Sequence, residues 1–84
     1  MKITNPEHKK QIKKEFLKLL IENGFSLRSF CQIHGDSSLY TKLHGNLNRY
    51  ASTDLLFIQE MINKIDRSKK VFLQNGRFVI AKPI

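Results

Sequence analysis

Residues 24–45 read GFSLRSFCQIHGDSSLYTKLHG, and they contain the signals for two short helices that the rest of the fold is built around. The first half of the stretch predicts a short helix over residues 27–34. Ser26 precedes it and is a residue type whose side chain caps the free amides of a first helical turn, while Gly35 ends the segment. Cys31 is a small residue in the middle of this helix, so a second helix can approach it closely.

The second half of the stretch predicts another short helix, over residues 38–44, directly after a sharp turn. Either Asp36 or Ser37 is expected to cap this helix, and Gly45 is expected to end it. Two helices of about two turns each, separated by a tight turn and preceded by a longer helix, are typical of a helix-turn-helix.

Longer helices are predicted on both sides of this pair. The run Asn5–Glu7 is a helix start, because asparagine caps free amides, proline suits the first helical position and a carboxylate complements the helix dipole. A helix over about 6–23 follows from it. Residues 46–52 are predicted to form a loop, and Thr53–Asp54 is expected to cap a last helix over about 54–66. Apolar side chains recur at helical spacing in both long helices, which predicts one buried side for each.

The C-terminal segment, residues 70–81, predicts a β-hairpin. Asn75 and Gly76 form the dipeptide that favours a type I′ turn, and they separate two runs of β-prone residues. Leu73 then faces Phe78, and both faces of the hairpin carry large apolar side chains. One face is expected to pack on the helices, and the other is expected to be covered by the same hairpin of a second subunit. The residues assigned to this homodimer interface are Val71, Phe72, Leu73, Phe78, Val79 and Ile80.

Chain length and charge set the class of protein. Because 84 residues suffice for one core, we expect a single, mostly α domain, with four helices in a helix-turn-helix arrangement followed by the C-terminal β-hairpin. Fifteen Lys and Arg residues against seven Asp and Glu residues give a formal net charge of +8, which attracts polyanions, nucleic acid first among them. The longest apolar runs are a few residues long, so we expect no membrane contact and a place in the cytoplasm of a bacterial cell or phage-infected host.

The sequence gives no indication of catalysis or of a bound metal. Cys31 is the single cysteine, and the three scattered histidines do not have the spacing of a zinc site. Glycine-rich phosphate loops and paired-carboxylate motifs are also missing from the sequence. We therefore expect a protein that is not an enzyme and that needs neither a cofactor nor a metal.

The run GFSLRSFCQIHG followed by SLYTKLHG resembles the helix-turn-helix of lambda-repressor-like and Cro-like regulators, in particular small phage and plasmid DNA-binding proteins. The resemblance covers about residues 16–65 and leaves the hairpin outside. It implies that the helix over residues 38–44 lies in the major groove of DNA, which is wide enough for a helix and displays a distinct pattern of donors and acceptors for each base pair.

Leu39 and Leu43 are spaced four residues apart and are expected to face the core, which leaves the opposite side of this helix free. The lysines of the first helix are interpreted mainly as solvated surface. From the resemblance, the residues expected to read bases are Ser38, Tyr40, Thr41 and Lys42. The residues expected to contact the DNA backbone are Arg28, Ser37, Asn46, Asn48 and Arg49.

The function expected from these features is that of a sequence-specific regulator of transcription, a repressor or autoregulator, that binds double-stranded DNA. It would act as a homodimer on a palindromic operator, because one helix of this length reads only a few base pairs. The alternative is a protein-binding adaptor or inhibitor of phage or plasmid origin that uses the same scaffold and the apolar hairpin. RNA binding is less favoured, because the few aromatic residues are mostly placed at core positions.

Overall fold

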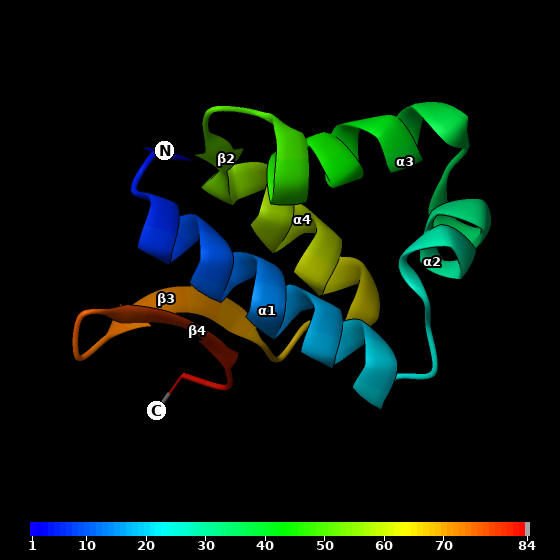
Figure 1. The fold of residues 1–84 in the computed structure, drawn as a ribbon. Coiled ribbons are helices and arrows are strands. Elements are labelled where there is room, and N and C mark those ends of the chain that lie inside the picture. Colours follow the sequence, from blue (N-terminus) through cyan, green and yellow to red (C-terminus); the bar gives the residue numbers. More distant parts are fainter. Residues whose placement is uncertain (84) are drawn as a thin grey trace.

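The structure, a computed structural model, describes residues 1–83, and in them four α-helices are followed by an antiparallel β-hairpin (Figure 1). This confirms the mostly α class with a C-terminal hairpin, and each helix boundary agrees with the predicted one within one residue. The helices are α1 (Pro6–Glu22), α2 (Leu27–His34), α3 (Ser37–His44) and α4 (Leu55–Ile65), and the hairpin strands are β3 (Lys70–Gln74) and β4 (Arg77–Ala81). No helix in residues 1–83 combines the length and apolar character needed to cross a bilayer.

Each helix begins at a side chain that accepts hydrogen bonds from the first free amides. These capping residues are Asn5, Ser26, Asp36 and Asp54. At α3 the cap is Asp36 and not Ser37, since the Asp36 carboxylate accepts from the amides of Ser38 and Leu39 at 2.9 and 3.2 Å. The connection from α2 to α3 is therefore only Gly35 and Asp36, as short as the sequence indicates.

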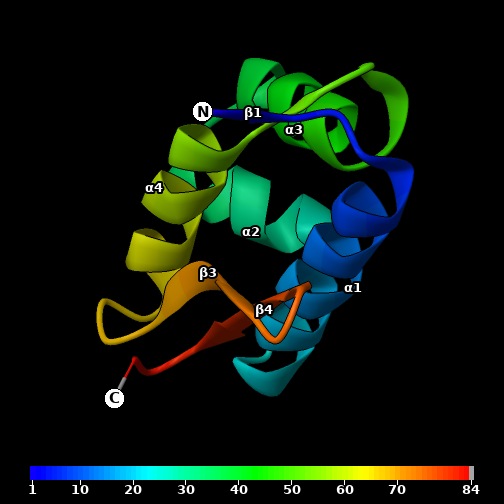
Figure 2. The same cartoon turned by 90° about the vertical axis from the view of Figure 1, so that its left-hand side faces the viewer.

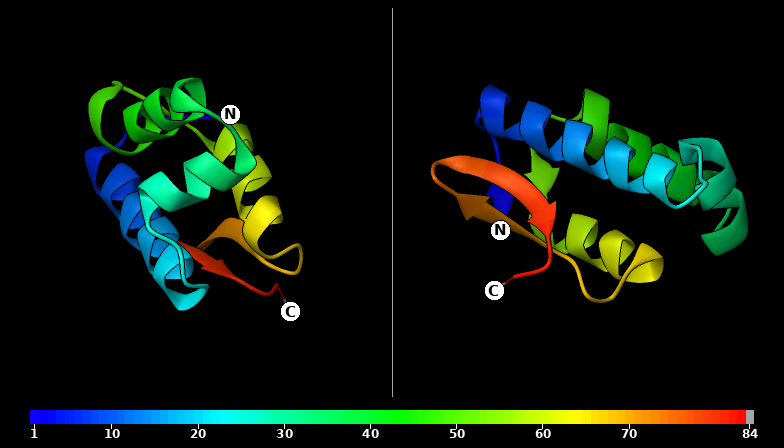
Figure 3. Two further views of the ribbon diagram at one scale, coloured as in Figure 1. Left: turned by 90° about the vertical axis from the view of Figure 1, so that its right-hand side faces the viewer. Right: turned by 90° about the horizontal axis from the view of Figure 1, so that it is seen from below.

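The helices enclose one core, with the hairpin and α3 on opposite sides of it. Figure 1 shows α1 crossing the middle of the molecule in front of α4, with α3 above and the hairpin below. In Figure 2 the hairpin spans the lower ends of α1 and α4, and in Figure 3 α2 lies across the end of the same two helices. The most deeply buried side chains are Ile12, Phe16, Leu20, Phe30, Cys31, Leu43, Thr53, Ile58 and Ile62.

The hairpin has the predicted register, with Leu73 opposite Phe78, and β4 lies along α1. Gln11 and Glu15, one turn apart on α1, accept hydrogen bonds from the backbone amides of Phe78 and Ile80 at 2.8 and 3.4 Å. These two amides point away from β3, so the side chains of α1 occupy the outer edge of β4. These amides of β4 are therefore not free to pair with a strand of another chain.

The edge of β3 is attached to α4 in a similar way. The side-chain amide of Gln59 accepts from the Val71 N–H at 2.9 Å and donates to the Lys69 carbonyl at 3.2 Å. One glutamine thus takes the place of a neighbouring strand at the start of β3. The hairpin is held to both long helices through its backbone as well as through its apolar side chains.

This packing corrects part of the predicted homodimer interface. Phe78 is only 2% exposed and contacts the ring of His8 edge-on, at 5.1 Å between ring centroids, so it serves the core of its own chain. Val71 and Ile80 also pack against that core. The physical reason is that a free-standing hairpin is marginal in water, and α1 and α4 supply the apolar surface that it needs. Of the predicted interface, Leu73 is exposed, and Phe72 and Val79 are half-buried but are not among the side chains that pack against the core.

The segment after α3 also differs from the prediction, because Gly45 does not end the helix. Gly45 has helical dihedral angles, φ −59° and ψ −48°, and residues Gly45–Arg49 continue as one turn of π-helix. The turn is closed by the Tyr50 N–H, which donates to the Gly45 carbonyl at 2.7 Å. The predicted loop over 46–52 is therefore wrong in its first half, where the helical hydrogen bonding widens by one residue.

Asn46 is the central residue of this turn and is 3% exposed. Its side chain donates to the Lys42 carbonyl at 2.9 Å and accepts from the Asp54 N–H at 2.7 Å, while its own carbonyl accepts from the Thr53 hydroxyl at 2.8 Å. The predicted contact of Asn46 with a DNA backbone is therefore wrong. A buried amide that joins two segments needs its hydrogen bonds inside the protein.

The segment that Asn46 holds also pairs with the N-terminus, which the sequence did not indicate. Strand β1 (Lys2–Ile3) runs antiparallel to β2 (Thr53–Asp54), and the Leu55 N–H donates to the Met1 carbonyl at 2.9 Å. Ile3 is buried by this pairing. The start of α4 is thus fixed by two short segments that are distant in sequence.

Replacement of Asn46 by Ala should lower the free energy of unfolding by about 1–3 kcal/mol, because the part-buried Asp54 amide loses its acceptor. Chemical denaturation followed by circular dichroism measures this change. Asn48→Ala is the matched control, since Asn48 is exposed and makes one long bond to the His44 carbonyl at 3.4 Å. Equal stability losses in the two variants would contradict the role given to Asn46.

Candidate nucleic-acid interface

The exposed side of α3 is the surface that the sequence singled out. Leu43 is fully buried and Leu39 packs half-buried against the same core. Thr41 lies on the opposite side of the helix, with Ser38 and Lys42 toward its flanks, and all three are exposed. The four-residue spacing of the two leucines fixes this orientation, because side chains so spaced share one face of a helix.

An open groove with a volume of about 510 Å³ runs along this side of α3. Four of its lining residues belong to α3, and the fifth is Tyr50, which follows the π-helical turn. The groove is lined by Ser37, Ser38, Thr41, Lys42 and Tyr50, so that hydroxyl groups and one ammonium group surround it. Tyr50 lies here because the π-helical turn, which replaces part of the predicted loop, folds it back over α3.

Two of the groove residues have partners that limit their freedom. The Thr41 hydroxyl donates to the Ser37 carbonyl at 3.0 Å, which leaves its oxygen lone pairs and its methyl group for a ligand. The Lys42 ammonium lies 4.5 Å from the centre of the Phe57 ring on α4, within range of a cation–π interaction. Lys42 is exposed, so its flexible side chain can still reach outward.

Tyr40 and Arg28 form a separate stack on the flank of α3. The Arg28 guanidinium lies 5.1 Å from the centre of the Tyr40 ring, and the ring of His44 is stacked on Tyr40 at 5.7 Å with an interplanar angle of 19°. Tyr40 is half-buried. Its ring therefore holds Arg28 near the mouth of a cleft of about 370 Å³ between α2 and α3. This position suits a contact at the edge of a bound ligand better than one at its centre.

The N-terminus of α3 is already occupied by a side chain. The Asp36 carboxylate accepts from the Ser38 and Leu39 amides, so a phosphate placed there would meet a negative charge. Ser37 remains exposed beside it and contributes to both the groove and the cleft. The first-turn amides of α3 are therefore a poor anion site.

Beyond α3, the π-helical turn presents Asn48 and Arg49 to solvent, as a contact with a nucleic-acid backbone would require. Asn46, expected beside them, is inside the molecule. The structure thus brings eight of the nine predicted contact residues to the surface of α2, α3 and the following turn, with Tyr40 alone among them only partly exposed: Arg28, Ser37, Ser38, Tyr40, Thr41, Lys42, Asn48 and Arg49.

Cys31 lies at the contact between α2 and α3 and is buried. Burial raises the pKa of its thiol, because the thiolate loses solvation. Within residues 1–83, no three side chains of the His, Cys, Asp or Glu type gather as metal ligands do. No protein-family model, no curated protein and no solved structure matches the chain.

The thiol of Cys31 should react with a disulfide reagent at pH 8 at least about ten-fold more slowly in the folded protein than in the chain unfolded by guanidinium. A raised pKa leaves less thiolate at this pH, and burial restricts access to it. Absorbance of the released thiol gives both rates, with glutathione as the reference for reagent quality. Equal rates for the folded and unfolded chains would mean that the contact between α2 and α3 is open.

Proposed function

We propose that the chain binds double-stranded DNA in a sequence-specific manner and regulates transcription, with α3 inserted in the major groove. The observation that carries this proposal is the exposed polar side of α3, which stands on a helix anchored by Leu39 and Leu43. Helices are the elements that most often enter the major groove, and their outward side chains meet the base edges there.

The exposed side of α3 carries polar groups that can form hydrogen bonds both with base edges and with phosphates. Ser38 and Thr41 carry hydroxyl groups that donate or accept, and Lys42 can donate to guanine acceptors or to a phosphate. The formal net charge of +8 adds a long-range attraction to a polyanion. Arg28 on one flank and Arg49 at the end of the π-helical turn are both exposed, and they would contact the backbone on either side of the groove.

Reading a palindromic operator requires two copies that present their α3 helices on the same side of the dimer, toward the DNA. The hairpin lies opposite α3 (Figures 1 and 2), so a two-fold contact through its outward face, Phe72 and Val79, would direct the two helices away from each other. A contact at the side formed by β3 and α4 avoids this. Leu73 and Leu56 on that side are 51% and 66% exposed. We place the homodimer contact there.

A second candidate function is favoured by the same apolar side. Met1, Leu55, Leu56 and Val71 line a shallow cleft of about 240 Å³, and Leu73 lies two residues farther along β3. Exposed apolar residues grouped around a cleft are typical of protein contacts. The chain would then be an adaptor or inhibitor that binds another protein, and the surface of α3 would be solvated.

Selection from random duplex DNA with the purified chain tests the proposal directly. A palindromic consensus is the expected result, because a homodimer on an operator imposes its two-fold symmetry on the site. A pool without enrichment, at low salt where charge contacts are strongest, would contradict DNA recognition and favour the adaptor.

Lys42→Ala should weaken binding to the selected site by about 1–3 kcal/mol, as expected for the loss of one base contact. A phosphate contact would instead reduce the slope of log affinity against log salt by about 0.9. Fluorescence anisotropy over a range of salt concentrations measures both quantities. Lys64→Ala on α4 is the control with the same change in charge, and a loss as large as that of the Lys42 variant would argue against a specific contact.

Leu73→Lys should shift the protein from dimer to monomer, because it places a charge in the proposed contact between copies. Sedimentation equilibrium gives the association constant. Ile21→Lys is the control, since Ile21 on α1 is 74% exposed and lies outside that side of the molecule. A wild-type chain that is monomeric both alone and on the operator would refute the homodimer.

A further inference from the structure

We propose that Tyr50 and α3 hold one sugar–phosphate strand of the duplex between them, and that Lys9 is the positioning residue that keeps Tyr50 in place. This inference rests on the proposed DNA binding, and it names how Tyr50 meets the duplex and a support, Lys9, that the sequence pattern did not indicate. Its basis is the geometry of three residues from different segments: Lys9 on α1, Gly45 at the end of α3 and Tyr50 after the π-helical turn.

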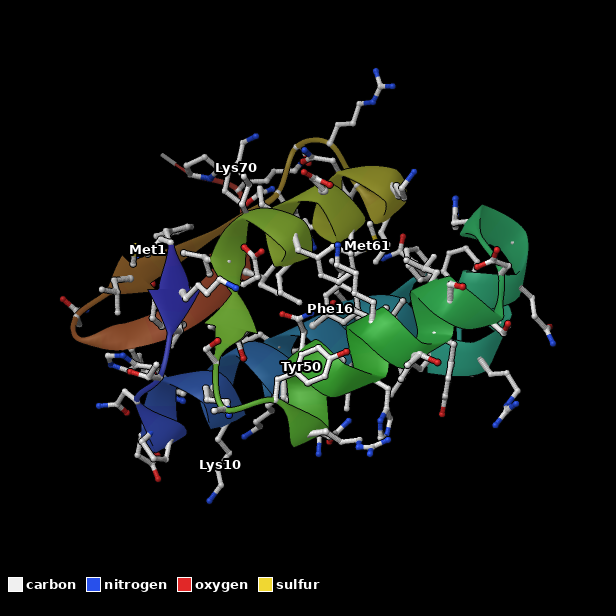
Figure 4. All side chains as sticks on the ribbon, turned by 90° about the horizontal axis from the view of Figure 1, so that it is seen from above. Met1, Lys10, Phe16, Tyr50, Met61 and Lys70 are labelled. Atoms are coloured by element: carbon white, nitrogen blue, oxygen red, sulfur yellow. The ribbon has the colours of Figure 1, made fainter. Side chains whose placement is uncertain are left out.

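The ring of Tyr50 is seated directly on the backbone of Gly45. A Cβ atom at Gly45 would lie 2.3 Å from Cζ of Tyr50, a distance that no real contact allows. Gly45 has ordinary helical angles, so the backbone itself does not require glycine there. Glycine is instead required at this position because the Tyr50 ring occupies the space of a Cβ atom. In Figure 4 the labelled ring of Tyr50 lies over the C-terminal part of α3, on the side that faces the viewer.

The backbone of Tyr50 is held from two sides. The Lys9 ammonium donates to the Tyr50 carbonyl at 2.6 Å and to the Ala51 carbonyl at 3.2 Å, and the Tyr50 N–H donates to the Gly45 carbonyl at 2.7 Å. The side chain nevertheless remains 47% exposed. An aromatic ring that is fixed but left outside the core is preorganised for a ligand, because its rotamer freedom is already lost before binding.

The chemistry of the groove identifies the ligand. Serine, threonine and tyrosine hydroxyls and the Lys42 ammonium line it, and the residues that line it include no carboxylate. Hydroxyl and ammonium donors suit phosphate oxygens, and the apolar face of a tyrosine ring suits the sugar. With α3 in the major groove, the strand that borders that groove passes beside the helix, where Tyr50 stands. An anionic strand also matches the net charge of +8.

The first test compares Lys9→Met with Lys10→Met in binding the selected duplex. Both variants lose one positive charge from α1, so the long-range attraction falls equally. Only Lys9 touches the carbonyls of residues 50 and 51, and the labelled Lys10 points away from the molecule in Figure 4. We expect the Lys9 variant to bind several-fold more weakly than the Lys10 variant. Equal losses would overturn the positioning role.

The second test uses Tyr50→Phe with a duplex in which each phosphate in turn is replaced by a methylphosphonate. Loss of the phenol should weaken binding to the unmodified duplex by about ten-fold, the range of a hydrogen bond to a charged group. At one phosphate the replacement should remove the difference between wild type and variant. A constant difference at every phosphate would overturn the strand contact.

The third test is a double-mutant cycle between Gly45→Ala and Tyr50→Ala. Gly45→Ala should weaken DNA binding in the wild-type chain, because the added methyl displaces the ring. The same substitution should have no effect on affinity once Tyr50 is alanine. Circular dichroism verifies that the variants fold, and additive losses would overturn the ring contact.

The outcomes separate this inference from the function on which it rests. If Lys42→Ala weakens binding while Tyr50→Ala binds like the wild type, α3 reads the duplex and the strand contact is wrong. If the wild-type chain binds no duplex, both are wrong. Binding of an acidic polypeptide in place of duplex, with the same loss in Tyr50→Ala, would assign the groove to a protein partner and overturn the DNA strand as its occupant.

Discussion

A helix of eight residues is not stable in water by itself, so α3 depends on the burial of one of its sides. Leu43 supplies that burial, with Leu39 beside it, and both pack on the core between α1 and α4. The same constraint determines the outward side. Because the two leucines cannot leave the core without losing the helix, Ser38, Thr41 and Lys42 are directed into solvent, and any ligand of α3 must meet them.

The turn that follows α3 joins this helix to the start of α4. Asn46 is itself buried and connects α3 to the start of α4 through part-buried hydrogen bonds, and each fully buried side-chain polar atom in residues 1–83 has a partner. Such a network is costly to break, since a buried donor without an acceptor loses its solvation. The π-helical turn is therefore rigid, and it carries Tyr50 back to the side of α3 that the leucines leave open.

In the hairpin, side chains from the helices form hydrogen bonds with strand edges that would otherwise be unpaired. Gln11 and Glu15 cover β4, and Gln59 covers the start of β3, so that side chains take the place of neighbouring strands. Edges left open are templates for pairing with other chains. The cover also explains why the hairpin is part of the monomer. What remains for a partner is the exposed apolar side chains along β3 and α4.

The elements that could be predicted from the sequence are those whose causes are local. The capping side chains of Asn5, Ser26 and Asp54, the leucine spacing of α3 and the Asn75-Gly76 turn each act within a few residues, and the structure has the elements that they predict. The outward side of α3 followed from the same spacing. Helical periodicity and turn chemistry need no knowledge of the rest of the chain.

The features that join distant segments could not be predicted, because they depend on how the folded chain brings those segments together. Asn46 looked like a surface residue because its partners, at Asp54 and Lys42, are fixed by how α3 meets α4. Gly45 was predicted to end a helix. Glycine is needed there because the ring of Tyr50 packs on its backbone and leaves no space for a Cβ atom. The support that Lys9 gives to Tyr50 spans 41 residues. Polar side chains are assigned to surface or interior by the neighbours that satisfy their hydrogen bonds, and those neighbours come together only when the chain is folded.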